Sequence, residues 1–142
     1  MNQTVFEDFK VPVRLKLSSL WAALMFCYIY GDYFGLYVPG KLQGMLGGEG
    51  PVGPVSEGSL IATALLLAAP GLMVFLSLAL SPRLCRWVNI GLGLFYTAVM
   101  LMTMPGAWWF YITLGVIEVA LSLLIVAHAW RWPGTVSVQA VD

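Results

Sequence analysis

The stretch from residue 87 to residue 117 contains no charged side chain. It is too long for one membrane crossing, because a helix needs only about 20 apolar residues to span a hydrocarbon core of about 30 Å. The pair Pro105-Gly106 divides this stretch, and Pro-Gly is a strong turn signal. The stretch therefore predicts two membrane-spanning helices joined by a tight hairpin.

Two more apolar segments precede this hairpin. The chain has 142 residues, of which 60% are hydrophobic and 10% are charged, whereas soluble domains carry about a quarter charged residues. We therefore expect an all-α fold, an integral membrane bundle of four transmembrane helices that forms a single domain at residues 17–130. The expected spans are residues 17–38, 60–80, 87–104 and 107–130, with an outer loop at 39–59, an N-terminal segment at 1–16 and a tail at 131–142.

The basic residues are distributed unevenly between the two sides of this bundle. Only Lys41 falls on the loop side, and the other six fall on the opposite side: Lys10, Arg14, Lys16, Arg83, Arg86 and Arg131. Because cytoplasmic segments carry the excess of Lys and Arg, we expect both termini to be cytoplasmic. Aromatic residues are expected at both interfaces: Trp21, Trp87, Trp130 and Trp132 at the inner one, and Tyr37, Trp108 and Trp109 at the outer one.

The outer loop is rich in glycine and proline. No Gly-Lys-Ser/Thr sequence follows the glycines, so they form no phosphate-binding motif, and most of the loop is interpreted as a flexible connection. Its first part, GKLQGML at residues 40–46, predicts a short amphipathic helix on the membrane surface, with Leu42, Met45 and Leu46 toward the lipid.

Asp32 is the only charged residue of the first expected span. Tyr28 precedes it by one helical turn on the same face, so its hydroxyl can reach the carboxyl. Gly31 and Gly35 form a Gly-x-x-x-Gly pair, which lets another helix approach closely. We therefore expect Asp32 to face protein.

Glu118 is the only charged residue of the fourth expected span, and it shares a helical face with Tyr111, Gly115 and Ser122. Tyr96 of the third span lies at a similar depth. If the first and fourth spans adjoin, the two acids can share one intramembrane polar pocket. Its predicted members are Asp32, Glu118, Tyr28, Tyr96, Tyr111 and Ser122.

No lysine or arginine lies inside any expected span, so neither acid has a salt-bridge partner in the bundle. Burying an unpaired carboxylate costs a large free energy, and we expect at least one acid to hold a proton at neutral pH and to donate a hydrogen bond. One interpretation is a proton or cation site on a transport path, which is typical of intramembrane acids. The other is a carboxyl that fixes helix packing.

Three further residues interrupt the apolar pattern. Pro70 removes one backbone donor and frees the carbonyl of Leu66, which predicts a kink satisfied by neighbouring groups or, alternatively, an ion ligand. His128 lies at a helix end, where the dipole favours it, and a haem or quinone contact is the alternative. Asn89 is interpreted as structural. The predicted packing residues are Gly31, Gly35, Pro70 and Gly115.

The sequence contains no recognisable catalytic constellation. No nucleophile, metal cluster or cofactor motif accompanies the two acids, and two cysteines with one histidine cannot build a closed zinc site. No basic patch with interleaved aromatic residues indicates nucleic-acid binding. We therefore predict no catalytic residue, no metal ligand and no nucleic-acid partner, and we leave the cofactor unknown. The predicted partners are the lipid bilayer and further membrane subunits.

The stretch VRLKLSSLWAALMFCYIYGDYFGLYVPGKLQGM, residues 13–45, resembles the opening of a bacterial family of small four-helix membrane proteins without an assigned function. The closing stretch WWFYITLGVIEVALSLLIVAHAW is similar in layout. The plan is also similar to that of DoxX-like four-helix membrane proteins, some of which are associated with redox or quinone-linked complexes. These resemblances imply a bacterial inner membrane and transfer no catalytic residue.

Three functions are compatible with these features. The first is a non-enzymatic accessory or structural subunit, or a homo-oligomer. The second is a small proton-coupled transporter or channel that uses the intramembrane carboxyls. The third is a quinone-linked redox subunit, with His128 or the tyrosines near the quinone.

Overall fold

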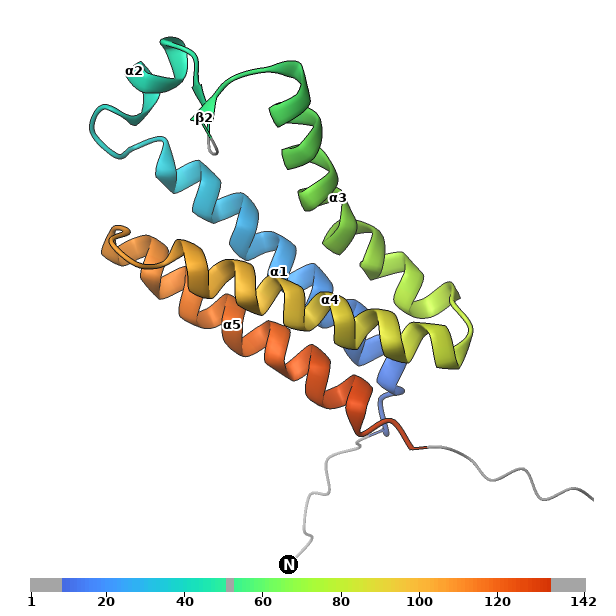
Figure 1. Ribbon diagram of the computed structural model, residues 1–142. Coiled ribbons are helices and arrows are strands. Elements are labelled where there is room, and N and C mark those ends of the chain that lie inside the picture. The colour runs from blue at the N-terminus through green and yellow to red at the C-terminus, as the bar shows by residue number, and fades with distance from the viewer. Residues whose placement is uncertain (1–8, 51–52, 134–142) are drawn as a thin grey trace, which may run out of the picture.

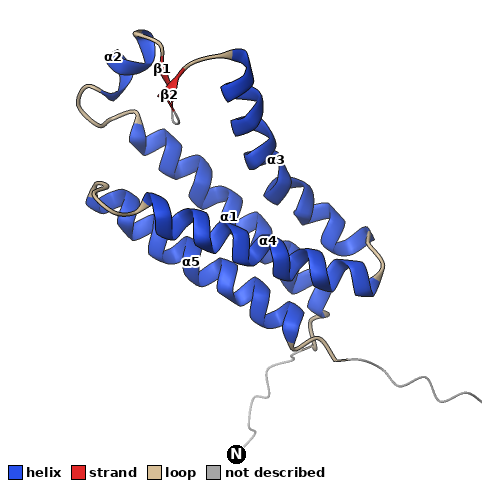
Figure 2. Cartoon of the chain, in the orientation of Figure 1, coloured by secondary structure: helices blue, strands red, loops and turns tan. Residues whose placement is uncertain are grey.

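The computed structural model describes residues 9–50 and 53–133. This part of the chain forms four long helices, one short helix and a two-stranded antiparallel ribbon (Figures 1 and 2). The elements in chain order are α1 (Val13–Gly35), α2 (Lys41–Leu46), β1 (Glu49–Gly50), β2 (Gly53–Pro54), α3 (Glu57–Ala79), α4 (Pro82–Thr103) and α5 (Trp109–Trp130). The all-α prediction is confirmed, apart from this small ribbon.

The long helices begin where the local sequence can satisfy their first backbone groups. At the start of α3, Ser56 and Ser59 each accept a hydrogen bond from the other's backbone N–H, which forms a capping box. Pro82 opens α4 at its first position, where a missing N–H costs nothing. α3 and α4 therefore start three and five residues before the apolar segments predicted from residues 60 and 87.

A tight turn joins α4 to α5, as the Pro105-Gly106 pair predicted. The backbone N–H of Ala107 donates to the carbonyl of Met104 over 3.1 Å. Gly106 has a φ of 78°, a value that residues with a side chain rarely adopt. Proline followed by such a glycine is the signature of a type II turn. The hairpin between the last two long helices is confirmed.

Three of the described helices, α3, α4 and α5, are long and apolar enough to cross a membrane. α1 has 23 residues, as α3 does. Its composition is more polar, because three tyrosines and Asp32 lie in its second half. α1 is therefore as long as the three helices that could cross a membrane, but it is less apolar than they are.

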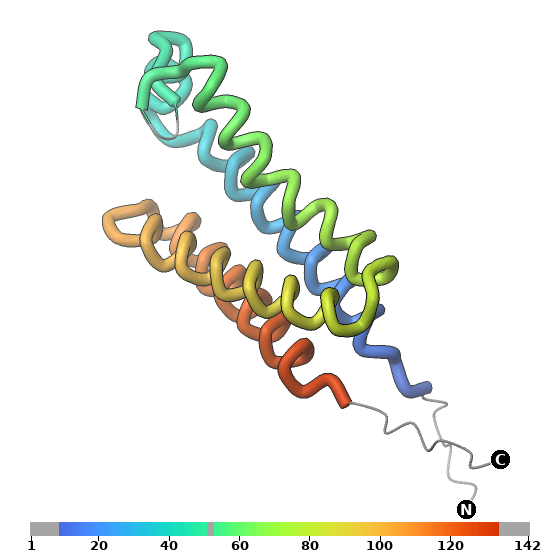
Figure 3. Tube along the Cα trace, turned by 45° about the vertical axis from the view of Figure 1, so that its right-hand side comes forward, coloured from blue at the N-terminus to red at the C-terminus, as the bar shows by residue number. Residues whose placement is uncertain are grey.

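The helices do not pack in a simple sequential order. α1 lies along both α3 and α5, and α5 lies along α4. α3 and α4 make few contacts, and the two helices separate toward the N-terminal end of α3 (Figures 1 and 3). The buried residues of α3, namely Pro70, Met73 and Ser77, all belong to its C-terminal half. The short connection between α3 and α4 therefore does not make these two helices close neighbours along their length.

Basic residues gather at one end of the bundle, which we call the arginine end. There Arg14 Nη1 donates to the carbonyl of Leu78 over 2.7 Å, and Arg86 Nη2 donates to the carbonyl of Trp130 over 3.0 Å. Each arginine thus satisfies a carbonyl at the C-terminal end of a neighbouring helix, where a positive charge is favoured. These contacts tie α1 to α3 and α4 to α5.

The opposite end, which we call the loop end, carries α2 and the β1–β2 ribbon. α2 coincides with the amphipathic helix predicted at residues 40–46. The apolar side chains of Leu42, Met45 and Leu46 are exposed on a single chain, as expected for a helix that rests on lipid. The loop is more ordered than a flexible connection, because β1 pairs with β2 and Val55 N–H donates to the carbonyl of Gly48.

Candidate functional site

Polar side chains occupy the core of the bundle at two levels. At the level nearer the arginine end, Trp21 Nε1 donates to Asn89 Oδ1 over 2.7 Å, and both residues are fully buried. The interpretation of Asn89 as a structural residue that bonds across helices is confirmed. The assignment of Trp21 to the inner interface is wrong, because its ring lies in the core against Tyr96, with 6.0 Å between the ring centroids.

The same level includes two buried residues that the sequence analysis did not select. Ser77 Oγ donates to Asn89 Oδ1 over 3.4 Å, and Cys85 Sγ donates to the carbonyl of Ser77 over 3.3 Å. Asn89 Nδ2 in turn donates to the carbonyl of Cys85 over 2.8 Å. This network links α1, α3 and α4, and its mutual hydrogen bonds indicate a packing role.

The second level begins at Pro70. Because Pro70 has no N–H, the carbonyl of Leu66 loses its helical donor, and the hydroxyl of Tyr96 donates to this carbonyl from α4. The expectation that a neighbouring group satisfies the freed carbonyl is therefore confirmed. Tyr96 also contacts Tyr28 of α1, with 6.0 Å between the ring centroids.

Thr97 and Ser122 connect α4 and α5 at a similar depth. Their hydroxyl oxygens lie 2.7 Å apart, and either can be the donor. Thr97 also donates to the carbonyl of Gly93 over 2.8 Å, and Ser122 can donate to the carbonyl of Val119 over 3.1 Å. Both hydroxyls are thus engaged, so Ser122 holds two helices together.

Glu118 lies one turn from Ser122 on the same face of α5 and is only 4% exposed. Its Oε2 is buried and has no hydrogen-bond partner among the described residues. Both α1 and α4 pack along α5. Because a buried polar atom without a partner is rare, Glu118 is the most unusual side chain of the core.

Asp32 does not join Glu118 in the core, which corrects the expectation that it faces the bundle interior. Its side chain is exposed on a single chain and makes no hydrogen bond within the described residues. Ser18 donates to the carbonyl of Val74, and Met25 lies beside Gly71, so this face of α1 points to α3. Asp32 continues the same face seven residues further, where α3 has already diverged.

Asp32 follows the point where α1 packs against α5: a Cβ on Gly31, its neighbour in the chain, would lie 3.7 Å from Leu114, one turn before Glu118. Of the predicted pocket members, Tyr96, Ser122 and Glu118 are buried in the core. Tyr28 is partly buried against Tyr96, and Asp32 is exposed.

Tyr111 and His128 lie away from this group. Tyr111 donates to the hydroxyl of Thr103 over 3.1 Å, near the α4–α5 turn. The Nδ1 atom of His128 lies 3.0 Å from the carbonyl of Leu124 in its own helix. Neither contact brings these residues to the buried carboxyl.

The predicted packing glycines differ in what surrounds them. A Cβ on Gly115 would lie only 2.9 Å from Met100 Cε. A Cβ on Gly31 would lie 3.7 Å from Leu114, an ordinary contact distance, and a Cβ on Gly35 would have no neighbouring atom within 4 Å. The tightest helix contact is at Gly93, which the sequence analysis missed. A Cβ there would lie 2.7 Å from Val126 Cγ2 and 3.2 Å from the carbonyl oxygen of Ser122.

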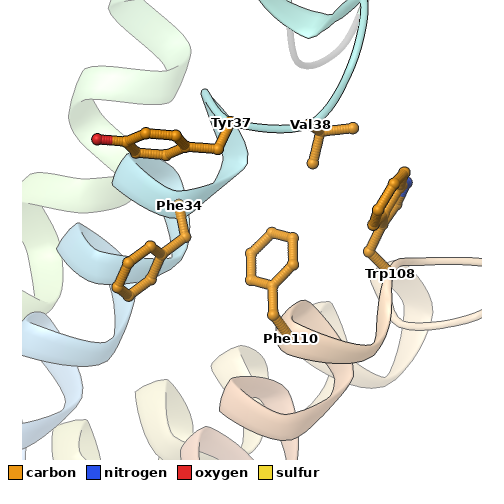
Figure 4. A pocket seen from close by; sticks show the side chains of 5 residues that line it. All are labelled: Phe34, Tyr37, Val38, Trp108 and Phe110. Atoms are coloured by element: carbon orange, nitrogen blue, oxygen red, sulfur yellow. The ribbon is translucent and has the colours of Figure 1, made fainter.

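Aromatic rings surround a shallow apolar pocket of about 280 Å³ at the loop end (Figure 4). Phe34 lines it from the end of α1, and Tyr37 and Val38 line it from the segment that follows α1. Trp108 and Phe110 line it from the start of α5. Trp and Tyr are enriched where a membrane meets water. The pocket places Tyr37 and Trp108, both predicted outer-interface residues, at the same end of the bundle.

Comparison with known proteins places the chain in a family. The model of a family of unknown function, DUF6326, matches residues 4–137. The chain belongs to the DUF6326 family. This match confirms the expectation of a family without an assigned function, whereas the bacterial source and the DoxX-like relation stay predictions. Searches of curated proteins and of solved structures gave no significant match.

Proposed function

We propose that this protein is an integral membrane protein with four spans, α1, α3, α4 and α5, and with both termini in the cytoplasm. α1 matches the length of a span and packs between two helices that are apolar enough to cross a membrane. The gathering of Arg14 and Arg86 at the arginine end supports a cytoplasmic location of that end. In a bacterium, the membrane would be the inner one.

We propose further that the protein is a non-catalytic accessory subunit or homo-oligomer. The observation that carries this proposal is the exposure of Asp32 on a single chain, at the level of the N-terminal half of α3, which has no buried residue. A carboxyl that faces hydrocarbon costs free energy unless a polar group meets it. A helix of a second subunit that packs beside Asp32 would supply this group, and Gly35 leaves room for its approach.

Native mass spectrometry and cross-linking in native membranes test this proposal. We expect the wild-type protein to form a homo-oligomer or a complex with another membrane protein. Gly35→Leu should abolish the assembly, whereas Gly91→Leu should preserve it, because both glycines have open surroundings but lie on different helices. A protein that stays monomeric in both experiments would contradict the proposal.

A small proton-coupled transporter is the second candidate, because Glu118 is a buried carboxyl without a hydrogen-bond partner in the described part of the chain. Intramembrane acids of this kind mark proton and ion paths. Glu118→Gln should abolish pH-driven uptake into proteoliposomes while the protein remains folded. Wild-type uptake that does not exceed that of empty vesicles would exclude this candidate for the solutes tested.

A further inference from the structure

We propose that α3 is hinged at Pro70 and Gly71, and that its first half, residues 57–69, is a gate over the second polar level of the core. We call this segment the α3 arm. The hydroxyl of Tyr96 latches the arm through the carbonyl of Leu66. The proposal deepens the transporter candidate and rests on it for the purpose of the gate, whereas the hinge itself can be tested separately.

The second half of α3 is anchored on two sides. Ser18 of α1 donates to the carbonyl of Val74 over 2.7 Å, and Ser77 donates to Asn89 of α4 over 3.4 Å. All the buried residues of α3 lie between Pro70 and Ser77. This half therefore forms the fixed part of the helix.

The α3 arm is anchored only lightly. None of its residues is buried, and Leu60, Ile61 and Leu65 are each more than half exposed. Its side-chain hydroxyls bond within α3 and its cap, and α3 separates from α4 toward this end (Figures 1 and 3). Within the described residues, the bond from Tyr96 is the single side-chain hydrogen bond that ties the arm to another helix. Segments with so few buried contacts move at low cost.

A hinge requires a point where the helix can bend. Pro70 donates no backbone hydrogen bond, so the turn before it lacks one of the bonds that keep a helix straight. Gly71 follows, and a Cβ there would lie 3.9 Å from Met25 Cε of α1. Because methionine is a flexible side chain, the pivot lies against a neighbour that can adjust when the arm swings.

Tyr96 connects the arm to the polar level behind it. It is only 4% exposed, and its ring centroid lies 6.0 Å from that of Tyr28. The hydroxyl of Thr97, the next residue of α4, lies 2.7 Å from that of Ser122, and Glu118 lies one turn from Ser122 on α5. When the arm swings outward, its carbonyl leaves the Tyr96 hydroxyl, and the level that contains the buried carboxyl opens on the side of α3.

Double electron–electron resonance spectroscopy measures the position of the arm in lipid bilayers. In a protein without its two native cysteines, spin labels at Leu60→Cys and Leu101→Cys report the arm against α4, since both positions are exposed. Labels at Phe75→Cys and Leu94→Cys, which are also exposed, report the fixed half of α3. We expect two populations of distances for the arm pair and a single narrow one for this reference pair.

Two substitutions should change the arm in opposite ways. Tyr96→Phe removes the latch and should raise the ratio of the longer to the shorter distance by about three- to tenfold, the factor that one lost hydrogen bond allows. Pro70→Ala restores a helical N–H and should leave a single narrow population. Tyr33→Phe is the matched control, because its hydroxyl bonds to Tyr37 over 2.8 Å on an exposed part of α1, and it should leave both populations unchanged.

A single narrow population for the arm pair, unchanged by Tyr96→Phe, would overturn the proposal, and so would equally broad distances for the reference pair. Two arm populations that persist in Pro70→Ala would overturn the assignment of the hinge. Because these measurements need no flux, a failed uptake experiment would remove the purpose of the gate and leave the hinge in place. A rigid arm would refute the hinge and leave the uptake result unchanged.

Discussion

Gly93 is the residue on which the close approach of α4 and α5 depends. A side chain there would collide with Val126 and with the backbone of Ser122. We expect Gly93→Ala to lower the free energy of unfolding by about 1–3 kcal/mol, the usual cost of overpacking. Thermal unfolding in detergent measures this loss.

Gly91→Ala is the control for this experiment, because Gly91 lies in the same helix and nothing occupies the space around it. Replacing glycine by alanine inside a helix stabilises it by up to about 1 kcal/mol, so the stability should stay equal or rise. Equal destabilisation by both substitutions would show that the contact at Gly93 is not the cause.

Asn89 accepts a buried hydrogen bond from the indole of Trp21. In Asn89→Leu, the buried N–H of Trp21 loses its acceptor, which costs about 1–3 kcal/mol. The double variant Trp21→Phe/Asn89→Leu should lose less stability than the sum of the two single variants, because no unpaired donor remains. Strict additivity in chemical unfolding would argue against a direct hydrogen bond.

Sequence patterns predicted some of these residue roles and missed others. The bond of Asn89 across helices and the satisfied carbonyl of Leu66 both follow from local chemistry, since a buried amide and a proline each demand a partner. The contact at Gly93 depends on which face of α4 meets α5, and glycine alone does not reveal this. The position of Asp32 could not be predicted either, because it depends on the direction of α3.

Pro70 of α3 and Tyr96 of α4 are linked through the carbonyl of Leu66. Tyr96→Phe removes the donor to the Leu66 carbonyl, and we expect a loss of about 1 kcal/mol. In a Pro70→Ala background the loss should be smaller, because the N–H of residue 70 can then donate to this carbonyl. A double-mutant cycle in thermal unfolding measures the difference.

Tyr111→Phe provides the comparison for this cycle. Its hydroxyl donates to Thr103 near the α4–α5 turn, far along the chain from Pro70, so its effect should add to that of Pro70→Ala. If Tyr96→Phe is equally additive, the proline does not create the acceptor that Tyr96 uses.

The positions of the four long helices could be predicted because each helix is bounded by chain breakers and filled with apolar residues. The Pro105-Gly106 turn was predicted in this way, and α2 was predicted from the amphipathic pattern of residues 40–46. The arrangement of the helices could not be predicted, since a short connection such as that before Pro82 limits the distance between two helix ends and leaves their angle free. The divergence of α3 from α4 is part of the arrangement that could not be predicted.

For the whole molecule, the proposed topology predicts which surfaces face the cell exterior. Glu49 and Arg83 are both exposed, at opposite ends of the bundle. In a protein without its two native cysteines, Glu49→Cys should react with a membrane-impermeant maleimide added to intact cells. Arg83→Cys should react only after the cells are permeabilised, and the reverse pattern would invert the topology.

The divergence of α3 also gives the molecule a wedge shape. The four helices lie close together at the arginine end, whereas α3 and the α4–α5 hairpin lie apart at the loop end (Figure 3). In the proposed orientation the cross-section is therefore larger in the outer leaflet than in the inner one. A bilayer accommodates such an inclusion with least strain where the outer leaflet is convex. In the proposed orientation, this shape would favour the location of the protein at cell poles and buds, where the outer leaflet is convex, over flat membrane.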